Sequence, residues 1–412
     1  MPRKKLSLMK IVIVDPIFKA SRLYYSKLAA QAANRLGYKP TILARNFSKT
    51  NHYFETMKDI DHDLFETCEL PEDFWYGKID SEQTFSLLEK IDSLSRDNDL
   101  IVYFSGLNEL WPTFLDVAEE HFSHLTNVNM IFVEYHPEYL LNVRKRVWAK
   151  GLTGKIKQYM RLLKHKRKIA TRITKFSKIF TNFKLIILDE RVKSKKYSDI
   201  PVPLRNNIII NCDPAPFSHS DIGSAQTDNI VILSVGTQSR RKGLVQLIRL
   251  AELETIKALP VTIKIVGRLD KDTSFLKKRI AKADNINFHE GYFSDADISE
   301  FYQNSDYIIL PYARSFTSSS GVLANAVAAN RPVLSSDHGL VGHRVAENNL
   351  GYTFPFESIP VLEENIIRLV RDFTTDKKDY TQFQRSSEKF LKTMSEETHV
   401  NTLIETFKNS GA

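Results

Sequence analysis

Short apolar runs alternate with longer segments of helical periodicity along most of the chain. In the first half the runs occupy residues 10–14, 40–44, 100–104, 129–134 and 207–211, and in the second half 230–235, 261–266, 286–289, 307–310, 332–334 and 351–354. Runs of this length are too short for helices and are typical of buried strands. Helices are predicted between them, for example at 21–36, 86–97 and 111–122. This rhythm predicts an α/β protein with two Rossmann-like domains that face a cleft.

The domain limits follow from breaks in this pattern. Residues 218–229 lack apolar periodicity and are rich in turn-forming residues, so they are predicted to be the linker. The N-terminal domain is then 1–217 and the C-terminal domain 230–395. We expect short strands at 178–182 and 185–188, and closing helices at 360–373 and 380–407, of which 396–412 could return to the N-terminal domain.

The stretch 307–337 predicts a strand, a serine-rich loop, a buried helix and a second strand. Asn330 stands where a left-handed helix cap belongs, and Pro332 prevents continuation. A parallel βαβ unit places the start of such a helix at the ligand-binding edge of the sheet. The N–H groups of Gly321, Val322 and Leu323 could bind an anion there. A buried helix with a serine N-cap accounts for the same residues, and both interpretations stay open.

Composition narrows the class of protein. The chain has 412 residues, 42% hydrophobic and 26% charged, with only two cysteines. That excludes a disulfide framework and favours a reducing compartment. No apolar run approaches the roughly 18 residues that span a bilayer, and the basic start is followed by a strand that ends at Asp15. We therefore expect a cytoplasmic protein.

The positive charge is concentrated in one segment. The net charge is +9, yet residues 139–188 contain fifteen lysines and arginines and no acidic residue, so the remainder sums to 9 − 15 = −6. Within this segment apolar residues recur at helical spacing from Trp148 to Ile173. An amphipathic cationic helix commonly lies on an anionic membrane surface. The residues expected to contact the membrane are Arg144, Lys145, Arg146, Trp148, Lys155, Lys157, Arg161 and Lys164.

The same basic segment is compatible with two roles besides membrane binding. It could be a solvated helix whose apolar stripe packs on its own domain, or a nucleic-acid-binding helix. No RNA-binding motif or helix-turn-helix pattern accompanies it, so a nucleic-acid partner is not expected. A membrane association would place the protein at the inner face of the plasma membrane.

Two further motifs carry possible chemistry. His136 follows the strand at 129–134, at the ligand edge of the sheet, where a functional role and a structural one are equally compatible. Asp295 and Asp297 could suggest a metal-binding pair. Because Ser294 precedes them and a helix follows, a helix cap is favoured, and no metal site is predicted.

The loops of the second half resemble those of retaining, GT-B-fold glycosyltransferases of family 4, the glycosyl transferases group 1. The segments that carry the resemblance are IVILSVG with Lys242-Gly243, IKIVG at 263–267, INFHEGY at 286–292, FYQNSDYIILPY at 301–312 and SGVLANAVAANRPVLSSDHG at 320–339. The resemblance is good over residues 230–356. In the N-terminal half it extends to the alternation of strands and helices, with Tyr135-His136-Pro137 and NNIIINCDPAPF as weaker matches.

The resemblance implies a donor site and its residues. Lys242 and Arg240 would neutralise the leaving diphosphate, and His136 would face them as a third catalytic residue. The nucleotide sugar, a substrate rather than a cofactor, would contact Gly236, Thr237, Arg241, Gly267, Arg268, Gly291, Tyr292, Thr317, Ser319, Ser320, Gly321, Val322, Leu323 and Asn325. No cofactor is expected. The acceptor would be a glycan or a lipid-linked sugar, and the process cell-surface polysaccharide or glycoconjugate synthesis.

The sequence departs from the family at four positions, one of which is Asn330, in place of the glycine after the helix. Thr317 and Asn325 stand where the family has two glutamates, and Thr237 stands where it has an arginine. Neutral side chains bind hydroxyls without the strength of a charge-assisted bond. A non-catalytic glycosyltransferase-like subunit that supports an active partner is therefore the alternative, and a sugar-nucleotide epimerase of the same architecture stays open.

Overall fold

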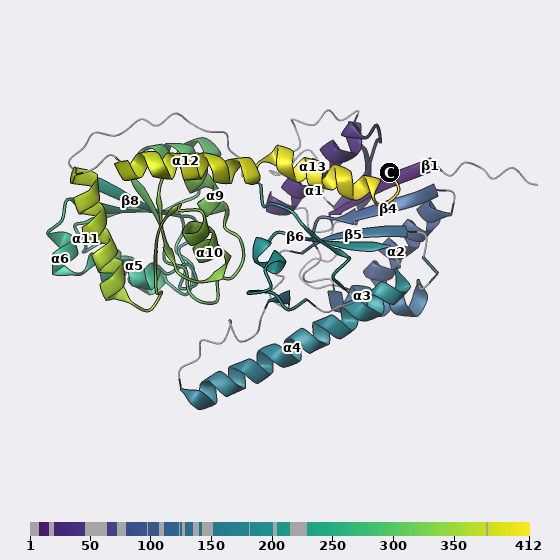
Figure 1. Cartoon of the computed structure of the whole chain (residues 1–412), viewed down its shortest axis with the longest axis horizontal. Coiled ribbons are helices and arrows are strands. Elements are labelled where there is room, and N and C mark those ends of the chain that lie inside the picture. The colour runs from purple at the N-terminus through teal and green to yellow at the C-terminus, as the bar shows by residue number, and fades with distance from the viewer. Residues whose placement is uncertain are drawn as a thin grey trace, which may run out of the picture. The chain divides into compact units, whose positions relative to one another are not determined.

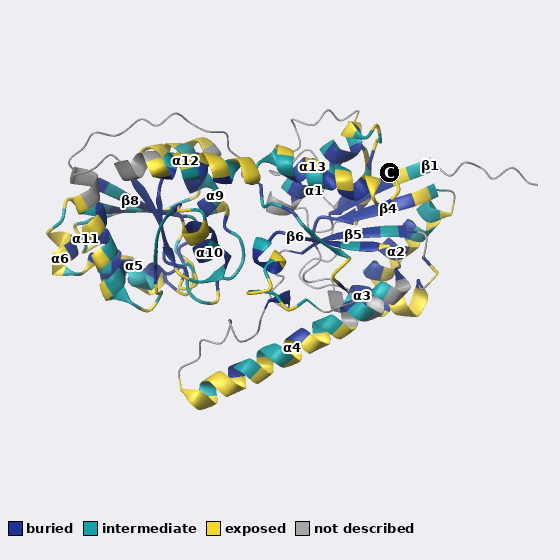
Figure 2. Ribbon diagram, viewed as in Figure 1, coloured by how far each residue is buried: buried dark blue, intermediate teal, exposed yellow. Residues whose placement is uncertain are grey.

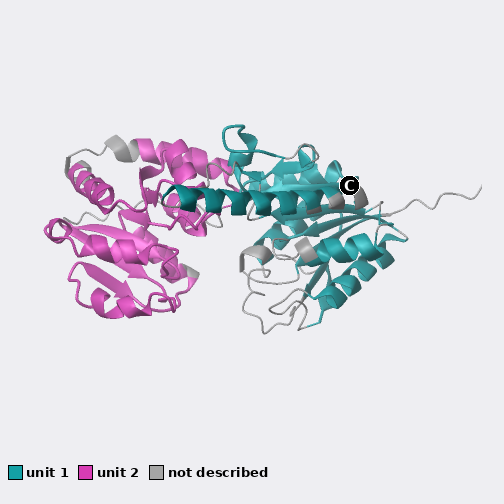
Figure 3. Cartoon of the chain, turned by 90° about the horizontal axis from the view of Figure 1, so that it is seen from below, with its two compact units in different colours: residues 1–212, 396–412 teal, residues 213–395 magenta. Residues whose placement is uncertain are grey.

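The computed structural model describes residues 8–15, 20–45, 64–71, 80–96, 98–106, 111–122, 124–125, 128–134, 140–141, 151–180, 182–200, 204–214, 229–375 and 378–412. They form two compact units (Figure 3), unit 1 comprising Met1–Cys212 with Glu396–Ala412, and unit 2 comprising Asp213–Ser395. Of the expected linker 218–229, only Asn229 lies within the described residues.

Among the described residues, unit 1 is built on a parallel sheet of seven strands in the order β3-β2-β1-β4-β5-β6-β7. The strands are β1 (Leu8–Asp15), β2 (Thr41–Arg45), β3 (Glu66–Leu70), β4 (Asn98–Phe104), β5 (Val128–Glu134), β6 (Phe183–Ile187) and β7 (Ile208–Ile210). The helices are α1 (Ala20–Arg35), α2 (Ser81–Ser95), α3 (Trp111–His121), α4 (Leu152–Ile179) and α13 (Glu396–Lys408). Figure 1 shows this α/β arrangement.

Alternate residues of the central strands enter two separate cores. Val12, Val102 and Phe132 pack on one face with α2, α3 and the second half of α4. Ile13, Tyr103 and related residues pack on the other face with α1 and α13. This alternation is the period of two expected of a strand buried on both faces. Figure 2 shows the resulting dark sheet between partly exposed helices.

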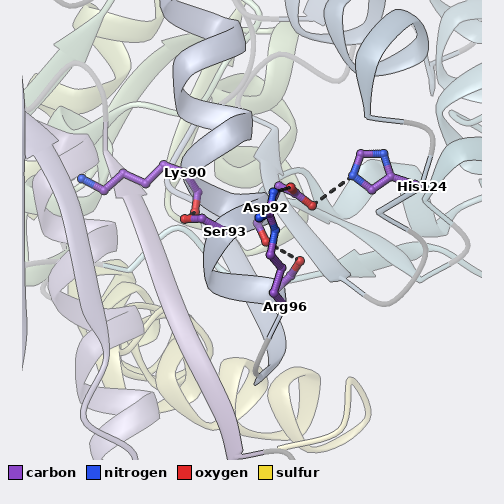
Figure 4. A network of polar contacts seen from close by, with 6 residues as sticks. Lys90, Asp92, Ser93, Arg96 and His124 are labelled. Carbon is purple, nitrogen blue, oxygen red and sulfur yellow. Dashed lines mark hydrogen bonds and ion pairs between the residues drawn. The ribbon is translucent and has the colours of Figure 1, made fainter.

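A polar network links α2 to the residues that follow α3 in unit 1 (Figure 4). The Asp92 carboxylate on α2 accepts from Arg96 Nη2 at 2.9 Å and lies 3.0 Å from His124 Nε2, beyond α3. The hydrogen bond from Arg96, followed by that from His124, lowers the pKa of Asp92. The network therefore fastens the end of α3 to α2.

Unit 2 has a second parallel sheet, in the order β10-β9-β8-β11-β12-β13. Its strands are β8 (Ile230–Val235), β9 (Val261–Val266), β10 (Ile286–His289), β11 (Tyr307–Leu310), β12 (Val333–Ser336) and β13 (Gly351–Phe354). Its α-helices are α5 (Leu244–Ala251), α6 (Glu254–Lys257), α7 (Lys277–Ile280), α8 (Asp295–Gln303), α9 (Gly321–Ala328), α10 (Gly339–Glu347), α11 (Ile359–Thr375) and α12 (Lys378–Thr393). The predicted pair of Rossmann-like sheets is confirmed.

Three local predictions are wrong. The prediction of a strand at 178–182 is wrong, because α4 continues to Ile179 and the next strand begins at Phe183. The helix predicted at 380–407 is two helices, with Met394 and Ser395 between α12 and α13. The edge strand β3 was not predicted, because Glu66–Leu70 carries two glutamates and lacks an apolar run.

Other details agree with prediction. Asn330 adopts the expected left-handed conformation, with φ of 54°. Ser294 caps α8 through a reciprocal capping box with Asp297, so the cap interpretation of that motif is confirmed.

Candidate donor site in unit 2

The loops after β8 and β11 meet where the strand order of unit 2 reverses. A Cβ atom added at Gly243, whose φ is +82°, would stand 1.7 Å from the Pro311 carbonyl oxygen. The Ala313 N–H donates to the Arg241 carbonyl at 2.9 Å, which joins the same two loops. Open α/β sheets bind ligands at such a reversal, outside the carboxyl ends of the strands. The two loops therefore contact each other at the position where sheets of this kind bind ligands.

Lys242 is the most unusual charged group at this edge. Its Nζ lies close over Gly236, where a Cβ atom would approach it to 2.8 Å. Burial, followed by the nearby Arg241 guanidinium, lowers the pKa of Lys242. No acidic side chain pairs with it among the residues described for unit 2. A bound anion would supply the missing countercharge.

The two neighbouring arginines are placed differently. The Arg240 guanidinium lies 4.9 Å from the Phe275 ring and its Nε donates to the Asp272 carbonyl at 3.1 Å. The Arg241 guanidinium lies 4.6 Å from the ring of Phe316, on the loop after β11. Arg241, next to Lys242 in sequence, therefore contacts the loop that precedes α9. Arg240 instead contacts the segment after β9. Thr237 is exposed in the same loop.

The start of α9 is only partly available to a ligand. Ser320 caps the helix: the Leu323 N–H donates to the Ser320 carbonyl at 3.0 Å and to its Oγ at 3.4 Å. The prediction that Leu323 offers a free N–H group is therefore wrong. The N–H groups of Gly321 and Val322 have no acceptor within the described part of the chain. Gly321 is exposed and Ser319 is half-buried beside it.

A buried hydroxyl pair supports this helix start. Ser320 Oγ lies 3.1 Å from the Tyr312 hydroxyl, and both side chains are buried. Burial raises the pKa of Tyr312 to about 12, against a smaller opposing effect of the Ser320 hydrogen bond. The Tyr312 and Phe316 rings lie 4.2 Å apart. Ser320 thus serves the helix cap that was one of the two predicted interpretations.

Thr317 and Asn325, which replace the family's glutamates, have separate surroundings. Asn325 interacts with the buried Tyr302 of α8, and its Oδ1 is buried without a hydrogen-bond partner in the described chain. Thr317 is half-buried where the loop after β12 packs: a Cβ atom at Gly339 would lie 3.5 Å from its Cα. The Asn325 carboxamide thus belongs partly to the interior of unit 2.

The ends of β9 and β10 carry the second part of the predicted donor site. Gly267, with φ of +125°, approaches the loop after β8 so closely that a Cβ atom would lie 2.2 Å from the Gly236 oxygen. The Arg268 guanidinium lies 4.7 Å from the Tyr292 ring and hydrogen-bonds its hydroxyl. Tyr292 is 85% exposed and follows Gly291. The structure thus brings Arg268 and Tyr292 together as a flat, exposed pair.

One residue at this edge was not singled out from the sequence. His338 follows β12, its side chain is 14% exposed, and neither ring nitrogen has a hydrogen-bond partner among the described residues. Its Nδ1 lies 3.6 Å from an Asp337 oxygen. Its position just after a buried strand could have identified it from the sequence, because the same position was the reason for considering His136.

Part of the predicted set lies outside the described residues: His136 with its neighbours, and Arg144, Lys145, Arg146 and Trp148. The other predicted membrane-contact residues, Lys155, Lys157, Arg161 and Lys164, are exposed on α4. Among the helices of the described residues, none combines the length and apolar character needed to cross a bilayer.

The apolar stripe of α4 divides in two. Its first part is exposed, with Leu152 at 76%, Ile156 at 54% and Met160 at 58%. Its later part packs on unit 1, where Ile173 is fully buried and Ile169 partly so. Lys166 is buried between them and pairs with Asp199 at 2.7 Å. Packing on its own domain, one of the roles predicted for this segment, thus accounts for the second half of the helix only.

Comparison with known proteins agrees with this architecture. Residues 218–390 match the family model of glycosyl transferases group 1. No curated protein sequence matches the chain. Among solved structures, a glycosyltransferase from Rickettsia africae is similar, with a TM-score of 0.66, 13% identity, and coverage of 98% of this chain and 99% of that one.

Two more solved structures extend the comparison. Anabaena HepE in complex with UDP-glucose has a TM-score of 0.61 and 12% identity, covering 97% of this chain and 99% of that one. WaaG, a glycosyltransferase involved in lipopolysaccharide biosynthesis, has a TM-score of 0.57 and 14% identity, covering 96% and 98%. The predicted fold class and the resemblance to GT-B glycosyltransferases are confirmed.

Proposed function

Because the chain has the GT-B fold and its second unit matches the group 1 glycosyltransferases, we propose that it transfers a sugar from a nucleotide-diphosphate sugar to a glycan or lipid-linked acceptor. Lys242 carries this proposal. It is a largely buried ammonium group without an acidic partner among the described residues, placed at the ligand edge of unit 2. Such a charge is costly unless an anion balances it.

The proposed reaction uses this charge directly. Cleavage of the sugar–phosphate bond transfers negative charge to the departing nucleotide diphosphate. Lys242 and Arg241 would neutralise it, and the free N–H groups of Gly321 and Val322 would donate to its oxygens. A preorganised set of donors stabilises the charge as it develops. These groups supply the positive charge that a metal ion supplies elsewhere, so we propose a metal-independent reaction, and retention of configuration from the family resemblance.

The Arg268–Tyr292 pair suits the nucleobase of the donor, since exposed planar side chains can stack on a base. HepE is described in complex with UDP-glucose, which makes UDP-sugars the first donors to test. Calorimetric titration with a panel of nucleotide sugars, followed by a transfer or hydrolysis assay, tests the proposal. Binding of a donor followed by turnover would support it.

The decisive variant is Lys242→Ala. It should retain the fold and reduce transfer by about 10²–10³-fold, the usual loss when one stabilising donor is removed. Lys282→Ala, which removes an exposed lysine of unit 2, is the matched control and should leave transfer unchanged. Full activity of purified Lys242→Ala would overturn the assignment of this residue.

A non-catalytic subunit is the second candidate, because Thr317 and Asn325 provide no carboxylate and Asn325 interacts with the interior Tyr302. The same titration separates the two. A chain that binds no nucleotide sugar would be a scaffold for an active partner, whereas a chain that binds and turns over a donor would be the enzyme.

We further propose that α4 places the protein on an anionic membrane, at the inner face of the plasma membrane, where surface polysaccharide or glycoconjugate synthesis uses lipid-linked acceptors. Residues 152–179 contain ten lysines and arginines and no acidic residue. Leu152, Ile156 and Met160 lie four residues apart and therefore form one exposed stripe. Basic side chains near anionic headgroups contribute about 1 kcal/mol each.

Vesicle flotation tests this placement. Vesicles of phosphatidylglycerol and phosphatidylcholine should carry the protein, and replacing Lys155, Lys157, Arg161 and Lys164 by alanine should abolish most of that binding. Replacing four exposed lysines of unit 2, Lys271, Lys278, Lys282 and Lys389, is the charge-matched control. Equal flotation of both variants would refute the role of α4. Retained, salt-sensitive binding of the wild-type chain to RNA but not vesicles would instead favour a nucleic-acid-binding role for the helix.

A further inference from the structure

A polar cleft of about 560 Å³ lies in unit 1 at the amino ends of its strands. Its walls come from the beginnings of β1, β4, β5 and β6, the turn before β7, and the residues that follow α13. Catalytic and nucleotide sites of α/β sheets lie at the opposite, carboxyl edge. The cleft is therefore separate from any site formed by the carboxyl ends of these strands.

The lining of the cleft is dominated by carboxamides. It includes Asn129, Asn182, Asn206, Asn207, Asn409 and Ser410. One lysine, Lys184, and one aspartate, Asp99, also contribute, so the formal charges of the lining cancel. A phosphate or nucleotide would require an excess of positive charge. The lining suits an uncharged ligand that both donates and accepts hydrogen bonds.

Some of these groups already have structural roles. Asn207 Nδ2 donates to the Phe183 carbonyl at 3.0 Å, and Lys184 Nζ donates to the Asn206 carbonyl at 3.2 Å. The side chains of Asn129, Asn182 and Asn409 have no hydrogen-bond partner within the described residues. Each carboxamide offers two N–H donors and an acceptor oxygen. Three unused carboxamides around one cleft match the adjacent hydroxyl groups of a sugar, each of which also donates and accepts.

We propose that this cleft binds a neutral saccharide chain, through hydrogen bonds from Asn129, Asn182 and Asn409 to its hydroxyl groups. The choice of a saccharide among polyhydroxylated ligands rests on the proposed glycosyltransferase function. The buried Phe183 ring offers no stacking surface, so hydrogen bonding dominates and binding is weak. Its role is to hold part of an acceptor or product glycan away from the reacting end, which raises the local concentration of that glycan.

Ligand-observed NMR on the full chain tests the proposal with neutral hexasaccharides of glucose, mannose and N-acetylglucosamine as probes. We expect saturation transfer to at least one of them at millimolar concentration. Asn409→Ala should weaken binding about five-fold, the usual effect of one hydrogen bond, and the triple alanine variant of Asn129, Asn182 and Asn409 should abolish it. Asn401→Ala, which removes an exposed asparagine of α13 outside the cleft, is the matched control.

The outcomes separate this site from the donor site. Binding that persists in Lys242→Ala and disappears in the triple variant supports the cleft, whether or not the chain proves to be an enzyme. Binding lost in Lys242→Ala but retained in the triple variant would overturn it, as would the absence of binding of every probe to the wild-type chain. If the triple variant fails to fold by circular dichroism, the exposed Asn409→Ala variant decides alone.

Discussion

The two sheets have the same kind of strand order but opposite charges at their carboxyl ends. In unit 1, β1 ends at Asp15 and β5 at Glu134, and Asp189 follows β6; these carboxylates are 0%, 2% and 3% exposed. In unit 2, the loops after β8 and β9 present Lys242 with Arg240, Arg241 and Arg268. Among the described residues, buried carboxylates therefore mark the carboxyl edge in unit 1, whereas cationic side chains that suit the proposed diphosphate mark it in unit 2.

The buried charges also differ in how they are balanced. Asp189 accepts two hydrogen bonds from the Arg191 guanidinium, at 2.6 and 2.9 Å, and Asp15 accepts one from the Ser26 hydroxyl at 2.9 Å. Lys242 has no comparable partner in the described chain. Removing one partner of an internally balanced buried pair destabilises the fold, whereas an unbalanced buried charge can be removed without that cost and is available to a ligand. Substitutions at these positions should therefore have effects of opposite sign.

The largest expected effect is the loss of the balanced pair. Asp189→Ala removes the carboxylate that accepts two hydrogen bonds from the buried Arg191 guanidinium and should lower the free energy of unfolding of unit 1 by about 3–5 kcal/mol. Hydrogen exchange of peptides from β5 to β7 during denaturant titration would measure it. A loss below about 1 kcal/mol would mean that the pair is solvated and that the contrast with Lys242 fails.

Backbone crowding gives the next largest effect. Gly243→Ala should cost about 3 kcal/mol or more, because its Cβ would collide with the Pro311 carbonyl and force the two site loops apart. Gly37→Ala in unit 1 is the matched control, since its φ of +83° is nearly identical but nothing lies within 4 Å. It should cost only about 1 kcal/mol. Thermal unfolding of both variants measures the difference; equal costs would show that the loops do not meet as described.

Removing a helix cap should lower stability by a smaller amount, and by a similar amount in the two units. Ser320→Ala removes the cap of α9 and Asp80→Ala that of α2, where the carboxylate accepts from Glu82 and Gln83 N–H groups. Each should lower stability by about 0.5–2 kcal/mol. Only Ser320→Ala should also weaken donor binding, which titration with UDP-sugars would reveal. An unchanged donor affinity in that variant would place the diphosphate away from α9.

The smallest effect concerns Lys242 itself and has the opposite sign. Because the folded-state pKa of Lys242 is lowered, the folded chain binds fewer protons than the unfolded chain between that pKa and 10.5. The free energy of unfolding should therefore rise with pH through this window. Below the window, the full cost of burying the charged Lys242 is present. Lys242→Met should therefore stabilise unit 2 at pH 7 by up to about 1 kcal/mol and remove the rise. Denaturant titrations at pH 7 to 10 would measure this, and a destabilised Lys242→Met would show that the charge is already paired.

The sequence predicted the two sheets because buried parallel strands are nearly continuous apolar runs, as Ile230–Val235 and Asn129–Glu134 illustrate. It did not predict β3, because Glu66 and Glu69 interrupt its apolar residues and make the segment resemble a loop. It also misplaced the end of α4, because the residues at 178–182 are compatible with a helix and with a strand. The glycines of the site could be predicted from the resemblance. The direction of a side chain could not: Arg240 and Arg241 are adjacent in sequence, yet one stacks on Phe275 and the other on Phe316. Such choices depend on packing partners distant in the chain.

The return of α13 to unit 1 bears on the order in which the protein folds during synthesis. Val400, Leu403 and Phe407 belong to a core otherwise formed by residues of the first 212, and Tyr103 and Phe407 pack edge to face. A ribosome releases the whole of unit 2 before it delivers these side chains. One face of the sheet of unit 1 therefore lacks part of its core until α13 has been synthesised, whereas unit 2 is complete earlier and can fold first. This order is the reverse of the usual one, in which the N-terminal domain folds first on a nascent chain.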